Sequence, residues 1–426
     1  MMIRAILRVL VILLLTTAAA KAQHRVVDAL KGQLAPIDSN QQEGYTMNMD
    51  LFSKAISGNQ ILALGEATHG TKNFVDFRLA IIKKLVGEHG YRAIVTESDF
   101  SSTLAMNDYI VYGKGNIQKC LQDMGYWMWN NPDFLETITW LKDYNATKDI
   151  NSRVHIYGCD MTVPMIIGEV LGGKQVLKKP LSPESVAGMK VLSAWHTKSL
   201  SKAEEVALKH LAEEVKVELA AHPDTSTFRN SLNTILQVIA FRMAGQGKVS
   251  SAIRDKSMLD NINWILKREN GGKLIFLAHN LHIARRPMIG GWENVGTLLG
   301  KTFGTRYYAL GLSFYKGEFR AQDRDSGKSA VFQVAQTSKN ALEYTFNETG
   351  VSNFYLDFAS VKGKAALADL LFKKKSLRSI GAIFSSAKRD EAATAIDAVA
   401  VEVFDGLVFF RNTHAIAPSF GWKKYD

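Results

Sequence analysis

The sequence contains few cysteines. Its 426 residues include only Cys120 and Cys159, and neither belongs to a C-x-x-C pair. This absence excludes zinc ribbons and thioredoxin-like redox motifs. Two cysteines also do not form the disulfide framework of a small secreted domain. We expect both to be buried free thiols.

Several common catalytic and nucleotide-binding motifs are also missing. The sequence has no G-x-S-x-G elbow, the most frequent serine esterase signature, and no H-E-x-x-H zinc motif. No Walker loop or G-x-G-x-x-G follows a predicted strand, so nucleotide binding has no support. Any active site must therefore come from residues that the fold, not the sequence order, brings together.

Long apolar runs are scarce, and the clearest one lies near the N-terminus. Arg4 and Arg8 precede the apolar run Val9–Leu15, and Ala20-Lys21-Ala22 follows it. This pattern predicts a signal peptide over residues 1–22, cleaved before Gln23, and hence a periplasmic or secreted protein. The alternative is an uncleaved anchor. A membrane helix needs about 20 apolar residues, and no second such stretch occurs, so we expect no membrane span after cleavage.

The positive charge is not organised as a nucleic-acid surface. The net charge of +11 falls to +8 without residues 1–22, and the excess is scattered in short clusters without interleaved aromatic residues. A nucleic-acid protein usually concentrates basic residues on one face or in a known module. We therefore expect no nucleic-acid partner.

Short apolar strands alternate with helices along much of the chain. The helix predicted over Asn73–His89 follows Ile61–Leu64 directly, and its apolar residues share one face. Such alternation predicts an α/β fold with a mostly parallel central sheet and helices on both faces, in three layers. The other predicted strands are Arg92–Glu97, Val154–Gly158, Lys273–Ala278, Arg306–Leu312, Phe354–Phe358, Ile380–Phe384 and Gly406–Phe410.

One long segment has no convincing strand. Residues 182–266 hold amphipathic helical patterns, as in Ser201–Leu219 and Thr227–Ala244. We interpret this segment as a helical cap inserted into one catalytic domain that spans residues 23–426.

Polar side chains follow four of the predicted strands. In an open parallel sheet, ligands bind beyond the carboxyl ends of the strands, so these side chains should meet. The residues are Glu66, His69, Glu97, Asp160, His279 and His282.

The chemistry of this set favours acid–base catalysis. Histidine titrates near neutral pH and can take a proton from water, while a carboxylate beside it fixes the tautomer. Glu66 and Glu97 are the candidates for that carboxylate. Arg78, nine residues after His69, could bind a substrate oxygen or stabilise an oxyanion. Each residue taken alone could equally be structural, and the argument depends on the set.

The same side chains could instead bind a metal ion. Glu66, His69, Glu97, His279 and His282 are of the types that hold zinc or manganese. We expect no cofactor, with a divalent metal as the alternative.

The sequence resembles the erythromycin esterase family in several blocks, in order, over about residues 45–415. The resemblance rests on Gly65–Thr71 with Phe77–Leu79, Gly90–Glu97, Trp127–Trp129 with Trp140, Tyr157–Met161, Arg254-Asp255 with Met258, Ala278–His282 and Tyr307–Gly311.

This resemblance implies a hydrolase that opens the lactone ester of macrolide antibiotics such as erythromycin. His69 would be the general base, with Glu66, Glu97, Arg78, His279 and His282 as further catalytic groups of the same cleft. The residues expected to bind the small-molecule substrate are Trp127, Trp129, Asp160, Asn280 and Arg254.

Two other functions stay open at this point. One is a divalent-metal hydrolase that acts on envelope esters or phosphoesters. The other is a relative that binds a ligand without catalysis.

Overall fold

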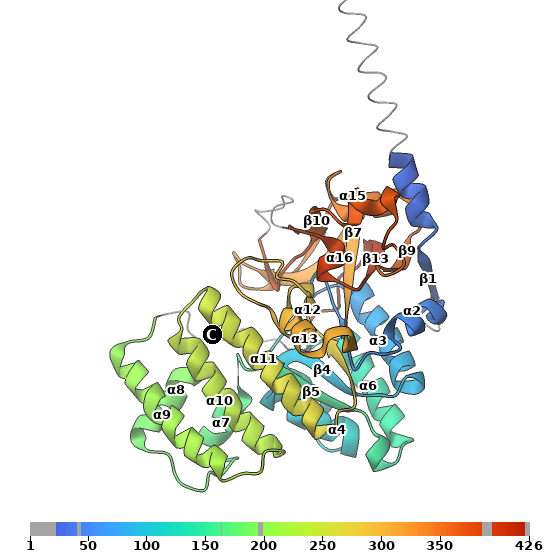
Figure 1. Ribbon diagram of the computed structural model, residues 1–426. Coiled ribbons are helices and arrows are strands. Elements are labelled where there is room, and N and C mark those ends of the chain that lie inside the picture. The colour runs from blue at the N-terminus through green and yellow to red at the C-terminus, as the bar shows by residue number, and fades with distance from the viewer. Residues whose placement is uncertain (1–22, 41–43, 163, 195–198, 386–393, 422–426) are drawn as a thin grey trace, which may run out of the picture.

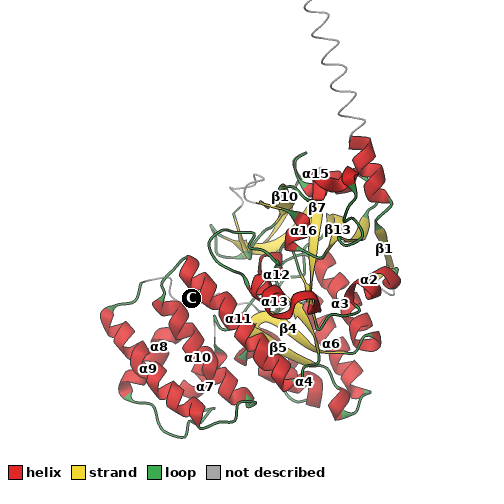
Figure 2. Cartoon of the chain, viewed as in Figure 1, coloured by secondary structure: helices red, strands yellow, loops and turns green. Residues whose placement is uncertain are grey.

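The computed structural model describes residues 23–40, 44–162, 164–194, 199–385 and 394–421. Its centre is one large sheet, drawn in Figures 1 and 2, with strand order β2-β1-β9-β13-β7-β3-β6-β4-β5 and with β8 and β11 also paired to β7. The strands are β1 (Ala35–Asn40), β2 (Gly44–Met47), β3 (Ile61–Leu64), β4 (Tyr91–Asp99), β5 (His155–Asp160), β6 (Lys273–Leu277), β7 (Tyr307–Asp323), β8 (Ser329–Val334), β9 (Asn353–Asp357), β11 (Ile383–Phe384) and β13 (Gly406–Thr413), while β10 (Lys375–Arg378) and β12 (Ala395–Ala398) form a separate pair.

The central strands are parallel and the outer ones are not. β13, β7, β3, β6, β4 and β5 run parallel to their neighbours in this order, whereas β9, β1, β2 and β8 pair antiparallel. Every residue of β3 is buried, as expected where helices cover both faces of a parallel sheet. The predicted α/β class is confirmed.

Helices cover both faces of this sheet (Figure 2). They are α2 (Met49–Ile56), α3 (Lys72–Glu88), α4 (Leu104–Tyr112), α5 (Ile117–Asp123), α6 (Pro132–Ala146), α7 (Met165–Leu171), α8 (Pro183–Ser193), α9 (Lys202–Ala220), α10 (Thr227–Met243), α11 (Lys248–Arg268), α12 (Asn280–Ile283), α13 (Val295–Phe303), α14 (Leu342–Glu348), α15 (Ala368–Leu371) and α16 (Ala400–Val403).

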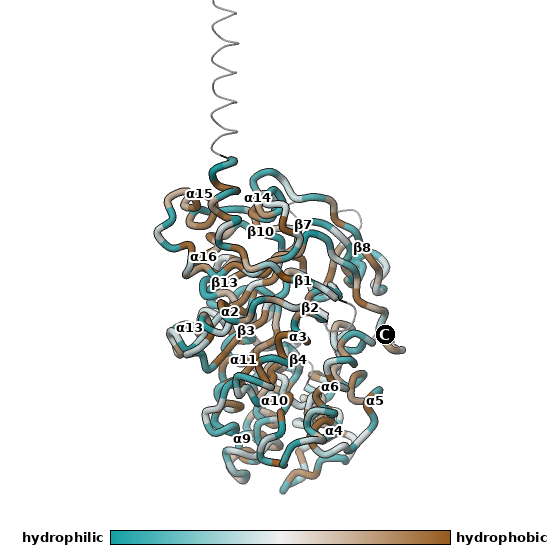
Figure 3. Tube along the Cα trace, turned by 90° about the vertical axis from the view of Figure 1, so that its right-hand side faces the viewer, coloured by the Kyte–Doolittle hydropathy of each residue, from teal (hydrophilic) through white to brown (hydrophobic). Residues whose placement is uncertain are grey.

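Alternate residues of each strand point to opposite faces and enter different cores. Leu62 and Leu64 of β3 pack in the core that contains α3, α4 and α6. Ile61 and Ala63 pack in the second core, with residues of α11, α13 and α14. The hydrophobic chain segments accordingly run through the interior in Figure 3.

A third core lies outside the sheet. Residues of α7, α8, α9 and α10 pack around Met189, Leu211 and Ile235, and Figure 1 shows these helices as a group beside the sheet. α11 runs from this group to the sheet, because its Ile253 packs with the third core and its Ile262 with the second. α8, α9, α10 and most of α11 occupy residues 182–266, the segment predicted as a cap, whereas α7 precedes it.

Most predicted strands are found within one or two residues of their expected ends, with three differences. β13 ends at Thr413, three residues beyond the predicted Phe410, because it stays paired with β7. β7 continues to Asp323, well beyond the predicted Leu312, because its second half pairs with β8 and β11. Of the strand predicted over Ile380–Phe384, only the last two residues pair.

The remaining predictions concern the cysteines and the N-terminus. Cys120 and Cys159 are free and buried, as expected. The predicted signal peptide, residues 1–22, lies outside the described residues. Within the described ranges, no helix combines the length and apolar character needed to cross a membrane.

The end of β4 carries a buried carboxyl that connects the sheet to α7. Asp99 is 1% exposed, and its Oδ1 accepts hydrogen bonds from the backbone N–H groups of Ser102 (2.9 Å) and Met165 (3.3 Å) and from the Ser101 hydroxyl. Burial raises the pKa of Asp99 from 3.8 to about 7, because few charges offset the loss of water.

This raised pKa predicts a pH-dependent stability. Between about pH 4 and pH 7 the native protein keeps a proton that the unfolded chain releases, so the free energy of unfolding falls as the pH rises. One pKa unit corresponds to about 1.4 kcal/mol.

Asp99→Asn keeps an oxygen acceptor and removes the titration, so its melting temperature should rise relative to wild type from pH 5 to pH 8. Asp149→Asn, at an exposed aspartate, is the control, and a pH-independent difference for Asp99→Asn would contradict the account.

Candidate active site

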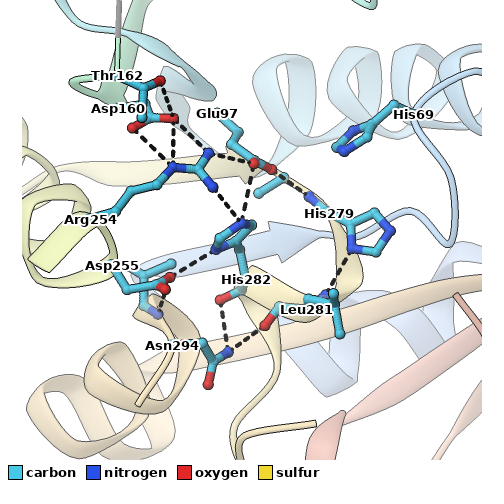
Figure 4. Close-up of polar contacts among 12 residues, drawn as sticks. His69, Glu97, Asp160, Thr162, Arg254, Asp255, His279, Leu281, His282 and Asn294 are labelled. Carbon is cyan, nitrogen blue, oxygen red and sulfur yellow. Dashed lines mark hydrogen bonds and ion pairs between the residues drawn. The ribbon is translucent and has the colours of Figure 1, made fainter. Parts of the chain in front are cut away.

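The ends of four adjacent strands bring the predicted side chains together. β3, β6, β4 and β5 are neighbours in the sheet and run parallel. Their carboxyl ends therefore deliver Glu66, Glu97, Asp160 and His279 to one edge. The short loop after β3 adds His69, and α12 adds His282 (Figure 4).

His69 is held by a buried carboxylate. Its Nδ1 lies 2.7 Å from Oε1 of Glu66, and the other carboxylate oxygen lies 2.6 Å from Nη1 of Arg78. Arg78 also donates from Nη2 to the carbonyls of Leu64 (2.7 Å) and Ala278 (2.9 Å). The guanidinium thus joins β3, α3 and β6 beneath the histidine.

The charges in this group favour an ionised Glu66. Burial by itself would raise the pKa of Glu66, but the attraction of Arg78 and the hydrogen bond with His69 lower it further than burial raises it. An ionised carboxylate accepts the Nδ1–H proton of His69 and leaves Nε2 unprotonated. Among the described residues no hydrogen-bond partner of this Nε2 is found.

His69 faces a large cleft of about 1790 Å³. Glu97, His279, His282 and Arg254 line the same cleft, which extends from the strand ends to the helical group. Apolar side chains make up much of its wall, among them Trp127, Met128, Met165, Ile167, Leu192, Phe241 and Met288.

A second charged cluster lies on the other side of Glu97. Nη2 of Arg254 is 2.9 Å from Oε1 of Glu97 and 2.6 Å from Oδ2 of Asp160, which is fully buried (Figure 4). Burial would raise the pKa of Glu97, but His282 and Arg254 hold it well below its ordinary value. Arg254 is thus already paired with two carboxylates.

His282 is placed between two carboxylates. Its Nδ1 lies 2.8 Å from Oδ1 of Asp255, and its Nε2 lies 3.2 Å from Oε1 of Glu97. Burial lowers the pKa of His282, but the attraction of Glu97 and Asp255 is greater, and the net pKa is raised. The two carboxylates thus stabilise the protonated ring, while Nη1 of Arg254, 3.2 Å from Nε2, opposes its charge.

Both ring nitrogens of His279 contact backbone groups. Its Nε2 lies 3.1 Å from the carbonyl oxygen of Ile380, Nδ1 accepts from the Leu281 N–H (3.2 Å), and its own N–H donates to Oε2 of Glu97 (2.9 Å). Burial, with the nearby His69, lowers the pKa of His279 to about 4. A neutral ring whose nitrogens are both occupied orients the site and has no free atom for proton transfer.

Five of the predicted residues do not line the cleft. Glu66, Arg78 and Asp160 lie behind the residues that do. Asn280 is buried, and its Nδ2 donates to the carbonyl of Leu312 at 2.8 Å. A fifth, Trp129, packs in the core and its indole donates to the carbonyl of Glu97 at 3.3 Å.

Three features of the site were not predicted from the sequence. Asp255 directly follows Arg254 in a block that had been noted, so a signal existed for it. Trp292 lines the cleft, and no motif or periodicity in the sequence marks it. The third is the C-terminal segment 413–421, which lies beyond the last predicted strand, Gly406–Phe410.

This C-terminal segment holds the loop that carries His69. Ile416 donates its N–H to the carbonyl of Gly70 (3.1 Å), and Lys72 donates to the carbonyl of His414 (2.8 Å). A side chain at Gly70 would lie 1.9 Å from the carbonyl oxygen of Arg320. Only glycine therefore fits where the loop is enclosed between β7 and the C-terminal segment.

The site has few side chains placed to coordinate a metal ion. In the part of the chain that the structure describes, no three histidine, cysteine, aspartate or glutamate side chains are placed to share one. Two of the five predicted ligands, Glu66 and Glu97, already pair with arginines. Metal dependence stays a prediction.

The fold and the site define a class: an α/β protein with a histidine–carboxylate acid–base centre at the ends of its parallel strands. The chain belongs to the erythromycin esterase family, whose family model, described as Erythromycin esterase, matches residues 86–413. Membership supports hydrolase activity on a small molecule.

Individual relatives are distant. The chain is 22% identical to erythromycin esterase type II of Escherichia coli, over 79% of this chain and 90% of that protein, and 22% identical to a protein of Bacillus subtilis named as a hydrolase, over 74% and 78%. Among solved structures, a succinoglycan biosynthesis protein matches with a TM-score of 0.76 at 21% identity, covering 92% and 98%. A mutant of the erythromycin esterase EreC in its open conformation matches with a TM-score of 0.64 at 15% sequence identity. That match covers 87% of this chain and 96% of the EreC chain. These structures share the fold.

The buried ion pair beneath His69 predicts a large cost for its removal. Arg78→Met leaves the Glu66 carboxylate buried without its cation, which should lower the free energy of unfolding by about 3–5 kcal/mol. Denaturant unfolding measures this. Arg92→Met is the matched control, because Arg92 is half-buried and the structure gives it backbone carbonyl partners, those of Val86 and Tyr91. Equal losses in the two variants would refute the importance of the pair.

Proposed function

We propose that the protein hydrolyses an ester or lactone with a water molecule activated by His69. The observation that carries this proposal is the 2.7 Å contact between Nδ1 of His69, which lines the cleft, and Oε1 of the buried Glu66. A histidine held in this way has the tautomer that a general base requires.

The proposed reaction proceeds in two steps. Nε2 of His69 takes a proton from water as the water oxygen bonds to the carbonyl carbon, and the carbonyl oxygen becomes an oxyanion. The charged His282, beside Arg254, provides positive charge toward that oxygen. The oxyanion then collapses, the bond to the alkoxy oxygen breaks, and this oxygen receives a proton from the protonated His69. An acid and an alcohol result.

The charge of the site favours an uncharged ester over a phosphoester. Arg78 is paired with Glu66, Arg254 with Glu97 and Asp160, and His282 with Asp255 and Glu97. A phosphate would bring a permanent negative charge toward these carboxylates. The cations are already shared with carboxylates, so the positive charge that they still offer suits the transient charge of an oxyanion better than the lasting charge of a phosphate.

The cleft favours a large substrate with an apolar body. Ligand pockets ordinarily measure about 300–1000 Å³, and this cleft of about 1790 Å³ exceeds them. Its apolar wall, together with the names of the curated relatives, makes a macrolide lactone such as erythromycin our candidate substrate.

Mass spectrometry of erythromycin incubated with the protein should show a product heavier by one water. His69→Ala should lower kcat by at least about 100-fold, the usual contribution of a general base, and circular dichroism should show an unchanged fold. His89→Ala is the control, since His89 contacts Ser53 at the far end of α3. Full activity in His69→Ala would disprove the assignment of the base.

A chelator tests the metal alternative in the same assay. Activity should survive prolonged incubation with a strong chelator. Loss of activity that zinc or manganese restores would favour a metal-activated water instead.

A further inference from the structure

The loop that follows His282 forms one wall of the cleft. Between α12 and α13, it contributes Pro287, Met288, Ile289 and Trp292 to the lining. Ile289 is 43% exposed. The wall therefore presents apolar surface to whatever occupies the cleft.

Two side chains hold this loop: Asn294 at its end and Trp292 two residues earlier. Asn294 donates from Nδ2 to the carbonyls of Leu281 (2.7 Å), His282 (3.1 Å) and Ala284 (2.8 Å), which closes the loop onto α12. Within the loop, the indole Nε1 of Trp292 donates to Oδ2 of Asp255 at 2.9 Å.

Asp255 joins the loop to His282. Its Oδ2 accepts from Trp292, while its Oδ1 accepts from Nδ1 of His282 (2.8 Å) and from the Val295 N–H (2.9 Å). Asp255 is 1% exposed. Because a carboxylate can rotate about its last bond, a donor on each oxygen is what fixes its plane, and this plane aims the imidazole.

We infer that Trp292 is a positioning and specificity residue that links the body of the substrate to His282 through Asp255. The inference rests on the function proposed above. The two roles reside in different parts of one side chain: the N–H group holds Asp255 and so aims His282, and the ring face contacts the apolar part of a large substrate in the cleft.

The physical basis is the exclusion of water from a chain of hydrogen bonds. When an apolar substrate covers the indole, the bonds from Trp292 to Asp255 and from Asp255 to His282 lie in a medium of lower polarity and become stronger. A small ester leaves the ring uncovered and gains nothing from it. The loop would therefore favour bulky lactones over small esters.

Two substitutions of Trp292 separate these roles. Trp292→Phe keeps an aromatic ring and loses the donor, so kcat for erythromycin should fall about tenfold, the loss expected for one hydrogen bond to a charged group, with KM nearly unchanged. The fall in kcat for p-nitrophenyl acetate should be smaller, because this ester leaves the ring uncovered. Trp292→Ala should in addition raise KM for erythromycin about tenfold and leave KM for the small ester unaltered. Trp264→Phe is the matched control, because that indole also donates one hydrogen bond, to the carbonyl of Asp224, from the same helix as Asp255.

A measurement without turnover decides the inference separately from the proposed function. In the full chain labelled with ¹⁵N-histidine, the ring signals of His282, assigned by their absence from His282→Gln, should move in Trp292→Phe, while those of His69 stay in place. Trp264→Phe should move neither. If no ester is hydrolysed, the proposed function fails while this result still stands. If the His282 signals of Trp292→Phe coincide with those of the wild type, or if Trp292→Ala leaves KM for erythromycin unchanged, the inference is overturned.

Discussion

The ion pair between Arg78 and Glu66 is the contact on which the rest of the site depends. Both side chains are almost completely buried, where an unpaired charge would be expensive. Arg78 compensates part of that cost by binding the carbonyls of Leu64 and Ala278 at the ends of β3 and β6. The pair therefore ties the position of Glu66, and with it the ring of His69, to the central strands of the sheet.

Around this ion pair, negatively and positively charged side chains alternate in the site. Glu66, Glu97, Asp160 and Asp255 alternate with Arg78, Arg254 and His282. Such an arrangement holds the pKa values of Glu66, Glu97 and Asp255 below their ordinary values next to a cleft without leaving excess positive charge for anions. It makes His69 and His282 chemically different: His69 contacts one carboxylate and has a nitrogen without a described partner, whereas His282 contacts two.

The sequence could predict the elements that local patterns specify. The apolar strands of the parallel core, the long helix α3 and the strand-end residues all follow from periodicity and from the rule that parallel strands end at one edge. It could not predict that Arg78 points beneath Glu66 and not into the cleft, because the direction of a side chain depends on packing between α3 and the sheet. Asn280 illustrates the same limit, since its amide turns to β7. Trp292 carries no signal because only the folded loop brings it to Asp255.

Long-range contacts of the C-terminal segment were equally beyond sequence patterns. The bond from Ile416 to Gly70 joins residues at opposite ends of the chain, and neither has a periodicity that marks it. The sequence thus indicates which chemistry is available, while the three-dimensional contacts decide which histidine can act as a base.

The central claim is that His69 activates water for direct attack on the acyl carbon. A single turnover of erythromycin with excess enzyme, quenched at a series of times and followed by intact-protein mass spectrometry, tests it. The account predicts that the ring-opened product forms while the mass of the protein stays unchanged at every time. A transient protein species heavier by the mass of erythromycin would show that a side chain of the protein attacked first, and would contradict the account.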